Sequence, residues 1–372
     1  MGRIKISIII KISSKKYIKE CLKNIEKQSL KDLELIFIET TNEDNNELLE
    51  IIKNTKLTSI ILNNNNINKS LNNALTKAQG DYILFMNDKD SLLDDKALEK
   101  MYEKGNSDNI NIVGGLCDCI DGHNSLISLE LHRVLLVGFD NGRLFKYENT
   151  MYDKYFNSYI FKKDLIVKSR ALFDENLRIS DDSFFIKVFN YSNDFFVIPI
   201  EMYRYNFIRE NLSVIDYYQI LLHLYNVIIY SKNNKLDILH YITIQRINND
   251  YGDIFEKYIR NGYFEFLRLV LDIQDNIDES LLKDVIINKP LDDIYESMNV
   301  NDKEIKQIEV QDNAKYILNI LFNLTQNEAI EKVRTTNSYY QQLDDIINSK
   351  AYKIGKFIVW LPKKILQLFR LR

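Results

Sequence analysis

A run of polar side chains follows an apolar segment near residue 85. The four residues are Asn87, Asp88, Lys89 and Asp90, and the segment before them reads "YILFM". Carboxylates at the end of a buried strand are suited to Mg²⁺ or Mn²⁺, because these hard cations prefer oxygen ligands. Here an asparagine and a lysine interrupt the carboxylates. The stretch is therefore a metal loop, a loop in which the lysine ammonium replaces part of the metal's charge, or a solvated turn.

A second pair of carboxylates, Asp181 and Asp182, precedes the apolar segment "SFFIKVF". Negative charge is favoured at the amino end of a helix, where the backbone N–H groups and the helix dipole point toward it. A helix N-terminus is thus a sufficient structural explanation for the pair. It is also compatible with a catalytic role for either carboxylate.

The cysteines offer little metal chemistry. Cys117 and Cys119 lie in "CDCIDGH", and Cys21 is the third cysteine of the chain. Zinc sites usually draw on two paired clusters of ligands, and no second pair is present in the sequence. We interpret Cys117 and Cys119 as alternating residues of a strand beside a turn. Three cysteines are also too few for a disulfide scaffold, and we expect no secretory signal, so a reducing cytoplasm is the predicted compartment.

The order of apolar segments predicts the elements that position these side chains. Segments with strand-like apolar runs alternate with segments whose apolar residues recur at helical spacing. The predicted strands are residues 4–12, 33–39, 58–63 and 82–86, and the predicted helices are residues 15–29, 47–53 and 68–79. This alternation predicts an α/β fold with a mostly parallel sheet. Ligands of such sheets bind beyond the carboxyl ends of the strands, where residues 87–90 are expected.

Three parts are predicted along the 372 residues. Residues 1–213 form the α/β domain, which becomes mixed α and β after about residue 94. Residues 214–330 form a mainly helical domain. Residues 331–372 form a basic tail, because seven lysines and arginines and no acidic residue follow Ile346.

The tail "SKAYKIGKFIVWLPKKILQLFRLR" places apolar residues on one helical face and lysines around it. A segment of this type suits the surface of an anionic membrane, whereas no run of residues is apolar enough to span a bilayer. The alternative is a helix that docks on its own domain or on a second copy in a homo-oligomer. With a net charge of −4 and no basic stripe on the rest of the chain, nucleic-acid binding is not expected.

Four motifs occur in an order that resembles the family 2 glycosyltransferases, which are inverting enzymes with a GT-A fold. The resemblance extends roughly from Lys5 to Ser213. Its motifs are "ISIIIKISSKKYIKECLKNIEKQSLKDLELIFIETTNEDNN", "ALTKAQGDYILFMNDKDSLL", "FKKDLIVKSRALFDENLRISDDSFFIKVF" and "MYRYNFIRENLS". Together they imply a GT-A-like, mostly parallel sheet flanked by helices and followed by a mainly helical region.

The resemblance implies transfer of a sugar from a nucleotide-diphosphate sugar to an acceptor hydroxyl, assisted by a divalent cation, Mn²⁺ or Mg²⁺, that is weakly required. It carries roles to individual residues. The base is Asp182 beside Asp181, the metal ligands are Asp88 and Asp90, and the donor pocket contains Ser13, Glu39, Asn72, Asp88 and Lys89. The acceptor is expected to be a glycan or a lipid-linked molecule in the synthesis of a surface polysaccharide or glycoconjugate, on the inner face of the membrane.

The donor side departs from the family pattern. The usual metal ligand is replaced by Lys89, an arginine by Leu71, an acidic residue by Thr40 and a proline by Lys11. If these changes abolish nucleotide binding, the chain is instead a non-catalytic GT-A-like module that binds a partner enzyme or a glycan. The presumed base position keeps its carboxylate as Asp182.

Overall fold

The computed structural model describes most of the chain up to residue 282. The described residues are 3–39, 50, 55, 57–63, 66–121, 126–129, 141–151, 153–179, 181–207 and 212–282. The predicted helix at residues 47–53, apart from residue 50, and the whole predicted tail at residues 331–372 lie outside them.

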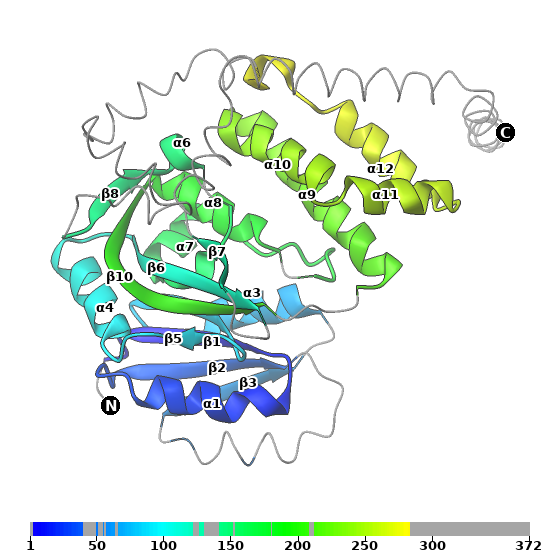
Figure 1. The fold of residues 1–372 in the computed structure, drawn as a ribbon. Coiled ribbons are helices and arrows are strands. Elements are labelled where there is room, and N and C mark those ends of the chain that lie inside the picture. The colour runs from blue at the N-terminus through cyan, green and yellow to red at the C-terminus, as the bar shows by residue number, and fades with distance from the viewer. Residues whose placement is uncertain are drawn as a thin grey trace, which may run out of the picture.

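One mixed sheet forms the centre of the molecule (Figure 1). Its order within the described residues is β3-β2-β1-β4-β9-β6-β10-β5, with β7 beside β6 and β8 beside β10. The strands are β1 (Ile6–Ile12), β2 (Leu33–Glu39), β3 (Thr58–Asn63), β4 (Tyr82–Asn87), β5 (Ser91–Leu92), β6 (Ile112–Asp121), β7 (Leu126–Leu129), β8 (Arg143–Lys146), β9 (Tyr159–Lys162) and β10 (Asp194–Phe207). Strands β1 to β4 run parallel to one another, as the sequence predicts.

Helices cover both faces of this sheet. On one face, α1 (Lys15–Glu26) and α4 (Ala97–Ser107) pack their apolar residues against alternate residues of β1, β2 and β4. On the other face lie α3 (Ile67–Lys77), α7 (Lys163–Ser169) and α8 (Ser183–Ser192). The central strands are therefore buried from both sides, which explains why their sequences are nearly continuous in apolar residues.

The step from α3 into β4 depends on a glycine. The backbone N–H of Gly80 donates to the hydroxyl of Ser7 in β1. A Cβ atom on Gly80 would lie 2.5 Å from the backbone nitrogen of Ser7 and 2.8 Å from the carbonyl carbon of Ile6. This close approach of two backbones has room only for a residue without a side chain.

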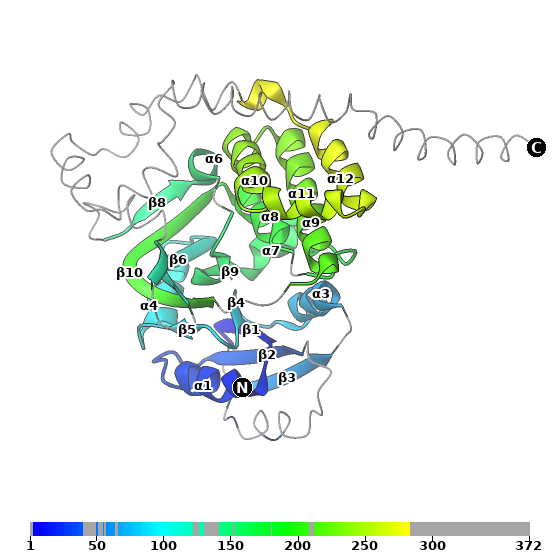
Figure 2. The ribbon, with the colours of Figure 1, turned by 45° about the vertical axis from the view of Figure 1, so that its right-hand side comes forward.

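Four helices gather beside α7 and α8 at one end of the molecule (Figures 1 and 2). They are α9 (Val214–Asn234), α10 (Asp237–Asn249), α11 (Gly252–Arg260) and α12 (Phe264–Gln274). At the start of α9, Ser213 and Asp216 form a reciprocal capping box, in which each side chain accepts from the other's backbone N–H. The helices share an apolar core of their own.

This architecture confirms the predicted fold class, an α/β sheet flanked by helices with a helical region after it. The predicted division into residues 1–213, 214–330 and 331–372 stays a prediction. Among the described residues, no helix has the length and apolar character needed to cross a membrane.

Candidate functional site

The carboxyl ends of β1 and β4 lie next to each other, and Asp88 ties them together. The parallel register pairs Lys11 of β1 with Asn87 of β4. One carboxylate oxygen of Asp88 accepts from the backbone N–H groups of Ser13 and Ser14, at 2.9 and 3.0 Å, and the other accepts from the Ser13 hydroxyl at 2.6 Å. Only 2% of the surface of Asp88 is exposed. This carboxylate therefore holds the loop that begins α1.

Asp90 is engaged just as fully. One carboxylate oxygen accepts from the Tyr203 hydroxyl at 2.8 Å and from the amide of Asn87 at 2.7 Å. The other accepts from the backbone N–H of Asn206 at 3.0 Å. Burial raises the pKa of Asp90, although these three hydrogen bonds and the charge of Lys89 oppose the shift. Asp90 thus fastens the turn after β4 to strand β10.

These contacts do not fit the prediction that Asp88 and Asp90 ligate a metal. Each carboxylate is almost completely buried, and both oxygens of each already accept hydrogen bonds from protein donors. A cation in either place would sit among N–H and O–H groups rather than among oxygen ligands. Within the described residues, no group of three or more His, Cys, Asp or Glu side chains is arranged to hold a metal ion.

The donor-pocket residues predicted from the family pattern lie in different surroundings. Glu39 is the last residue of β2, where the parallel register pairs it with Ile12 of β1. Its side chain is buried. The Asn72 side chain is committed elsewhere, because it donates to the carbonyl of Phe173 and accepts from the same residue's N–H. Asn72 therefore anchors the segment after α7 and does not offer a free amide to a donor. The roles of Ser13, Glu39 and Lys89 stay predictions.

A recess opens between the end of β1 and the start of α8. Its polar lining consists of Lys11, Asn157 and Asp182, above a floor of apolar side chains from the sheet and α8. The recess is small, with a volume of about 20 Å³, which is close to the space that one water molecule needs. The three polar groups carry an ammonium, an amide and a carboxylate, which is a set able to hold a polar molecule at the carboxyl edge of the sheet.

Asp182 is the residue of this recess best placed for proton transfer. Its carboxylate makes no hydrogen bond among the described residues, and it remains in contact with solvent. Protein nevertheless surrounds it on most sides. This partial removal from water raises the pKa of Asp182, against the opposing influence of His223 and Lys11.

Its neighbour Asp181 has the opposite character. The side chain is fully buried, and its two oxygens accept from the backbone N–H groups of Asp174 and Ser183 at 2.8 and 3.0 Å. Nδ1 of His223 lies 3.4 Å away, an ion-pair distance with poor hydrogen-bond geometry. Burial alone would raise the pKa of Asp181, but His223, Ser183 and Asp174 together lower it to about 2. Asp181 therefore holds the loop that carries Asp182 and does not itself face the recess.

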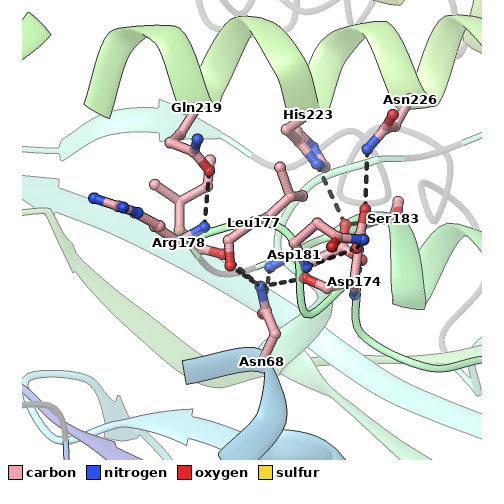
Figure 3. A network of polar contacts seen from close by, with 11 residues as sticks. Asn68, Asp174, Leu177, Arg178, Asp181, Ser183, Gln219, His223 and Asn226 are labelled. Carbon is pink, nitrogen blue, oxygen red and sulfur yellow. Dashed lines mark hydrogen bonds and ion pairs between the residues drawn. The ribbon is translucent and has the colours of Figure 1, made fainter. Parts of the chain in front are cut away.

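The same loop is bound from two further sides (Figure 3). From α3, the Asn68 amide donates to three backbone carbonyls, and its oxygen accepts from the N–H of Asp181 at 3.1 Å. From α9, Gln219 accepts from the N–H of Arg178 at 2.8 Å. The described residues of this loop, 173–179 together with Asp181 and Asp182, are thus held between the sheet domain and the helical region.

Residues 7–167 match the sequence profile of glycosyl transferase family 2. The match confirms, for this segment, the resemblance to the family 2 glycosyltransferases that the motifs indicate. It begins in β1 and ends in α7, and so includes the carboxyl ends of β1 and β4 where the recess lies.

Two curated relatives agree with this assignment. The chain is 24% identical over 220 residues to the uncharacterized glycosyltransferase EpsJ of Bacillus subtilis (strain 168). This alignment covers 57% of this chain and 64% of EpsJ. It is 26% identical over 161 residues to the poly(ribitol-phosphate) beta-N-acetylglucosaminyltransferase TarP of Staphylococcus aureus (strain N315), covering 41% of this chain and 46% of TarP. The alignments span less than two thirds of either relative.

The fold of the family 2 domain also occurs in a solved structure, that of S. aureus TarS 1-349 in complex with UDP-GlcNAc. The TM-score is 0.58 at 17% identity, and the match covers 74% of this chain and 82% of TarS 1-349. At this identity the likeness concerns the fold, and it confirms the GT-A-like architecture that the order of motifs predicts.

Two residues beside Asp182 are not among the site residues predicted from the sequence. Lys11 was noted only as a departure from the family pattern, yet it faces Asp182 across the recess. Asn68 was not singled out at all. The signal that was present is its position four residues before Asn72, which places both amides on one face of α3.

Proposed function

We propose that this chain is an inverting glycosyltransferase that moves a sugar from a nucleotide-diphosphate sugar to an acceptor hydroxyl. The observation that carries the proposal is the carboxylate of Asp182, which makes no hydrogen bond among the described residues and lies in the recess at the carboxyl edge of a family 2 sheet. TarS 1-349 binds UDP-GlcNAc, so a uridine nucleotide sugar is the first donor to test.

In the proposed reaction, Asp182 takes the proton of the acceptor hydroxyl as its oxygen attacks the anomeric carbon of the sugar. The bond from that carbon to the diphosphate breaks, and its electron pair leaves with the diphosphate. A single displacement inverts the anomeric configuration. The raised pKa of Asp182 suits this role, because a carboxylate of higher pKa is a stronger base.

The loop contacts support the same assignment of roles. Asp181 is held by two backbone N–H groups and stays ionised, whereas Asp182 projects from the start of α8 with its oxygens available. A buried, hydrogen-bonded neighbour fixes the position of the reactive group. Asp181 is therefore a positioning residue in this proposal, and Asp182 is the base.

The proposal extends to the cell. EpsJ and TarP are named as glycosyltransferases, and TarP acts on a poly(ribitol-phosphate), so a role in surface polysaccharide or glycoconjugate synthesis is the reading that we favour. The acceptor would be a glycan or a lipid-linked molecule. The enzyme would work in the cytoplasm, held at the inner face of the membrane by residues 331–372.

The deciding experiment compares the wild-type chain with Asp182→Asn. Nucleotide-sugar turnover is followed by release of the nucleoside diphosphate, and the anomeric configuration of the product by proton NMR. We expect Asp182→Asn to lose transfer by a factor of roughly 10²–10⁴, typical of a lost general base, while its affinity for uridine diphosphate stays within about twofold.

The alternative is a non-catalytic GT-A-like module, which the engagement of Asp88 and Asp90 by protein donors favours. A wild-type chain that turns over no nucleotide sugar and binds no nucleoside diphosphate at millimolar concentration would establish that alternative.

A further inference from the structure

We propose that Lys11 and Lys89 bind the diphosphate of the donor, and that the chain binds and uses this donor without a divalent cation. The inference rests on the proposed function and adds to it the means by which the leaving group is stabilised. It begins from a mismatch. The family pattern implies a metal, and the carboxylates that should hold it are engaged elsewhere.

The two predicted metal ligands, Asp88 and Asp90, both hold neighbouring loops in place through hydrogen bonds. Asp88 accepts three hydrogen bonds from Ser13 and Ser14, and Asp90 accepts three from Tyr203, Asn87 and Asn206. Releasing either carboxylate to a cation would leave buried N–H and O–H donors without partners, which is unfavourable in the protein interior. The residue between them, in the family's metal-ligand position, is the cation Lys89.

Lys11 brings a second positive charge to the same edge. It is the penultimate residue of β1 and the one residue of that strand that is not fully buried. Because side chains alternate along a strand, Lys11 shares the face of Ile9, which is the face covered by α3 and α8. It lines the recess together with Asp182. The register of the sheet sets Lys11 beside Asn87, two residues before Lys89.

Two ammonium groups supply the same formal charge as one divalent cation. Lysine is a good ligand for phosphate because its charge is compact and its three N–H donors rotate freely. As the bond between the anomeric carbon and the diphosphate breaks, the electron pair moves onto the diphosphate oxygen. Fixed positive charge beside that oxygen stabilises the transition state. The proton of the acceptor goes to Asp182, and neither lysine needs to give or take a proton.

Lys11 lies at the same edge of the sheet as the proposed base. Its ammonium lowers the pKa of Asp182, so the two groups sense each other's charge. The base stands on the acceptor side of the anomeric carbon and the diphosphate on the opposite side, as an in-line displacement requires. A cation at the end of β1 is placed to attract the diphosphate while the carboxylate at the start of α8 receives the acceptor.

The test is isothermal titration of the full chain with uridine diphosphate, once with EDTA and once with millimolar Mn²⁺ or Mg²⁺. Variants are Lys11→Gln, Lys89→Gln and the charge-conserving Lys11→Arg. The control is Lys77→Gln, which removes the same charge from an exposed residue. Lys77 is the last residue of α3 and lies near the start of β4, at the edge of the sheet opposite to Lys11 and Lys89.

We expect wild-type affinity to change less than about threefold between EDTA and metal. Each of Lys11→Gln and Lys89→Gln should weaken binding on the order of tenfold or more in EDTA, the usual effect of losing a charged hydrogen bond. Lys11→Arg and Lys77→Gln should bind like the wild type. Circular dichroism verifies that each variant is folded.

Wild-type binding that requires the cation would overturn this inference and leave the proposed function standing. Unchanged binding by Lys11→Gln would remove Lys11 from the site, and unchanged binding by Lys89→Gln would remove Lys89. A wild-type chain that binds neither uridine nor guanosine diphosphate, with or without metal, would overturn both the inference and the proposed function.

Discussion

Replacing Asp181 by asparagine should destabilise the fold, whereas the same change at Asp182 should not. Asp181 is fully buried, and each of its oxygens accepts a backbone N–H. An asparagine has a single acceptor oxygen, so its amide NH₂ would face the N–H of either Asp174 or Ser183. That N–H would lose its partner in the protein interior.

The size of the effect follows from the pKa. The ordinary value for this carboxyl is 3.8, and the pKa of Asp181 in the folded chain is about 2. One pKa unit corresponds to about 1.4 kcal/mol, so ionisation of Asp181 contributes about 2 kcal/mol to the free energy of unfolding. The hydrogen bonds from Ser183 and Asp174 are among the causes of this shift, so their loss is already included in that amount. Asp181→Asn should therefore lose about 2–3 kcal/mol at pH 7.

The sign of the pH dependence is fixed by the direction of the shift. A lowered pKa gives stability that is complete above about pH 4 and is lost as the pH falls toward 2. Asp181→Asn lacks this contribution at every pH. The difference in stability between the wild type and Asp181→Asn should therefore shrink by about 2 kcal/mol across that range.

Urea unfolding followed by circular dichroism, at neutral and at acidic pH, measures both effects. Asp182→Asn is the matched control. It removes the same charge from the neighbouring residue, whose side chain makes no hydrogen bond among the described residues. We expect its free energy of unfolding to lie within about 0.5 kcal/mol of the wild type, as for a partly exposed substitution. Equal stability of Asp181→Asn and Asp182→Asn would refute the division of roles between the two carboxylates.

Three further outcomes are expected. Lys89→Asp restores the family's carboxylate and should make nucleotide binding strongly dependent on Mn²⁺ or Mg²⁺ in the titration described above; binding that stays independent of metal would contradict this. Gly80→Ala should lower the free energy of unfolding by about 1–3 kcal/mol or more, because its Cβ would lie 2.5 Å from the Ser7 nitrogen; wild-type stability in urea would contradict the packing. The full chain should sediment with anionic vesicles more than with neutral ones, and less at high salt, whereas a chain ending at residue 345 should stay in solution with its fold intact. Unfolding of the shortened chain, or loss of a dimer, would assign the tail to internal or subunit packing.

The first four strands could be predicted because the information for them is local. The segment "IKISIIIKI" is apolar throughout, as expected of a strand covered on both faces, and it forms the centre of the parallel half-sheet. The start of α1 is equally legible, since the Ser14 hydroxyl accepts the N–H of Lys16 at its amino end. Alternation of such segments is sufficient to indicate the α/β class.

The roles of individual carboxylates could not be predicted, because they depend on partners far away in the sequence. That Asp88 follows a strand is visible, but its donors are Ser13 and Ser14, about 75 positions earlier. The same holds for Asp90, whose donor Tyr203 lies on β10, more than 100 residues later in the sequence. A carboxylate that ligates a metal and one that fastens two loops have the same local sequence.

The helical region after the sheet is part of the site in physical terms. Its first helix, α9, contacts the loop before α8 through Gln219, His223 and Asn226, while Asn68 of α3 holds the loop from the sheet side (Figure 3). Its second helix, α10, adds a largely buried ion pair of 2.6 Å between Arg246 and Asp153, close enough for Arg246 to lower the pKa of Asp182. A loop fixed from one side could swing its carboxylate away from the acceptor, and one fixed from both sides keeps it in place without substrate. Under the proposed function, preorganisation of this kind would place Asp182 before the reaction begins. Under the proposed function, the helices after residue 213 would therefore contribute to the chemistry by holding the position of Asp182.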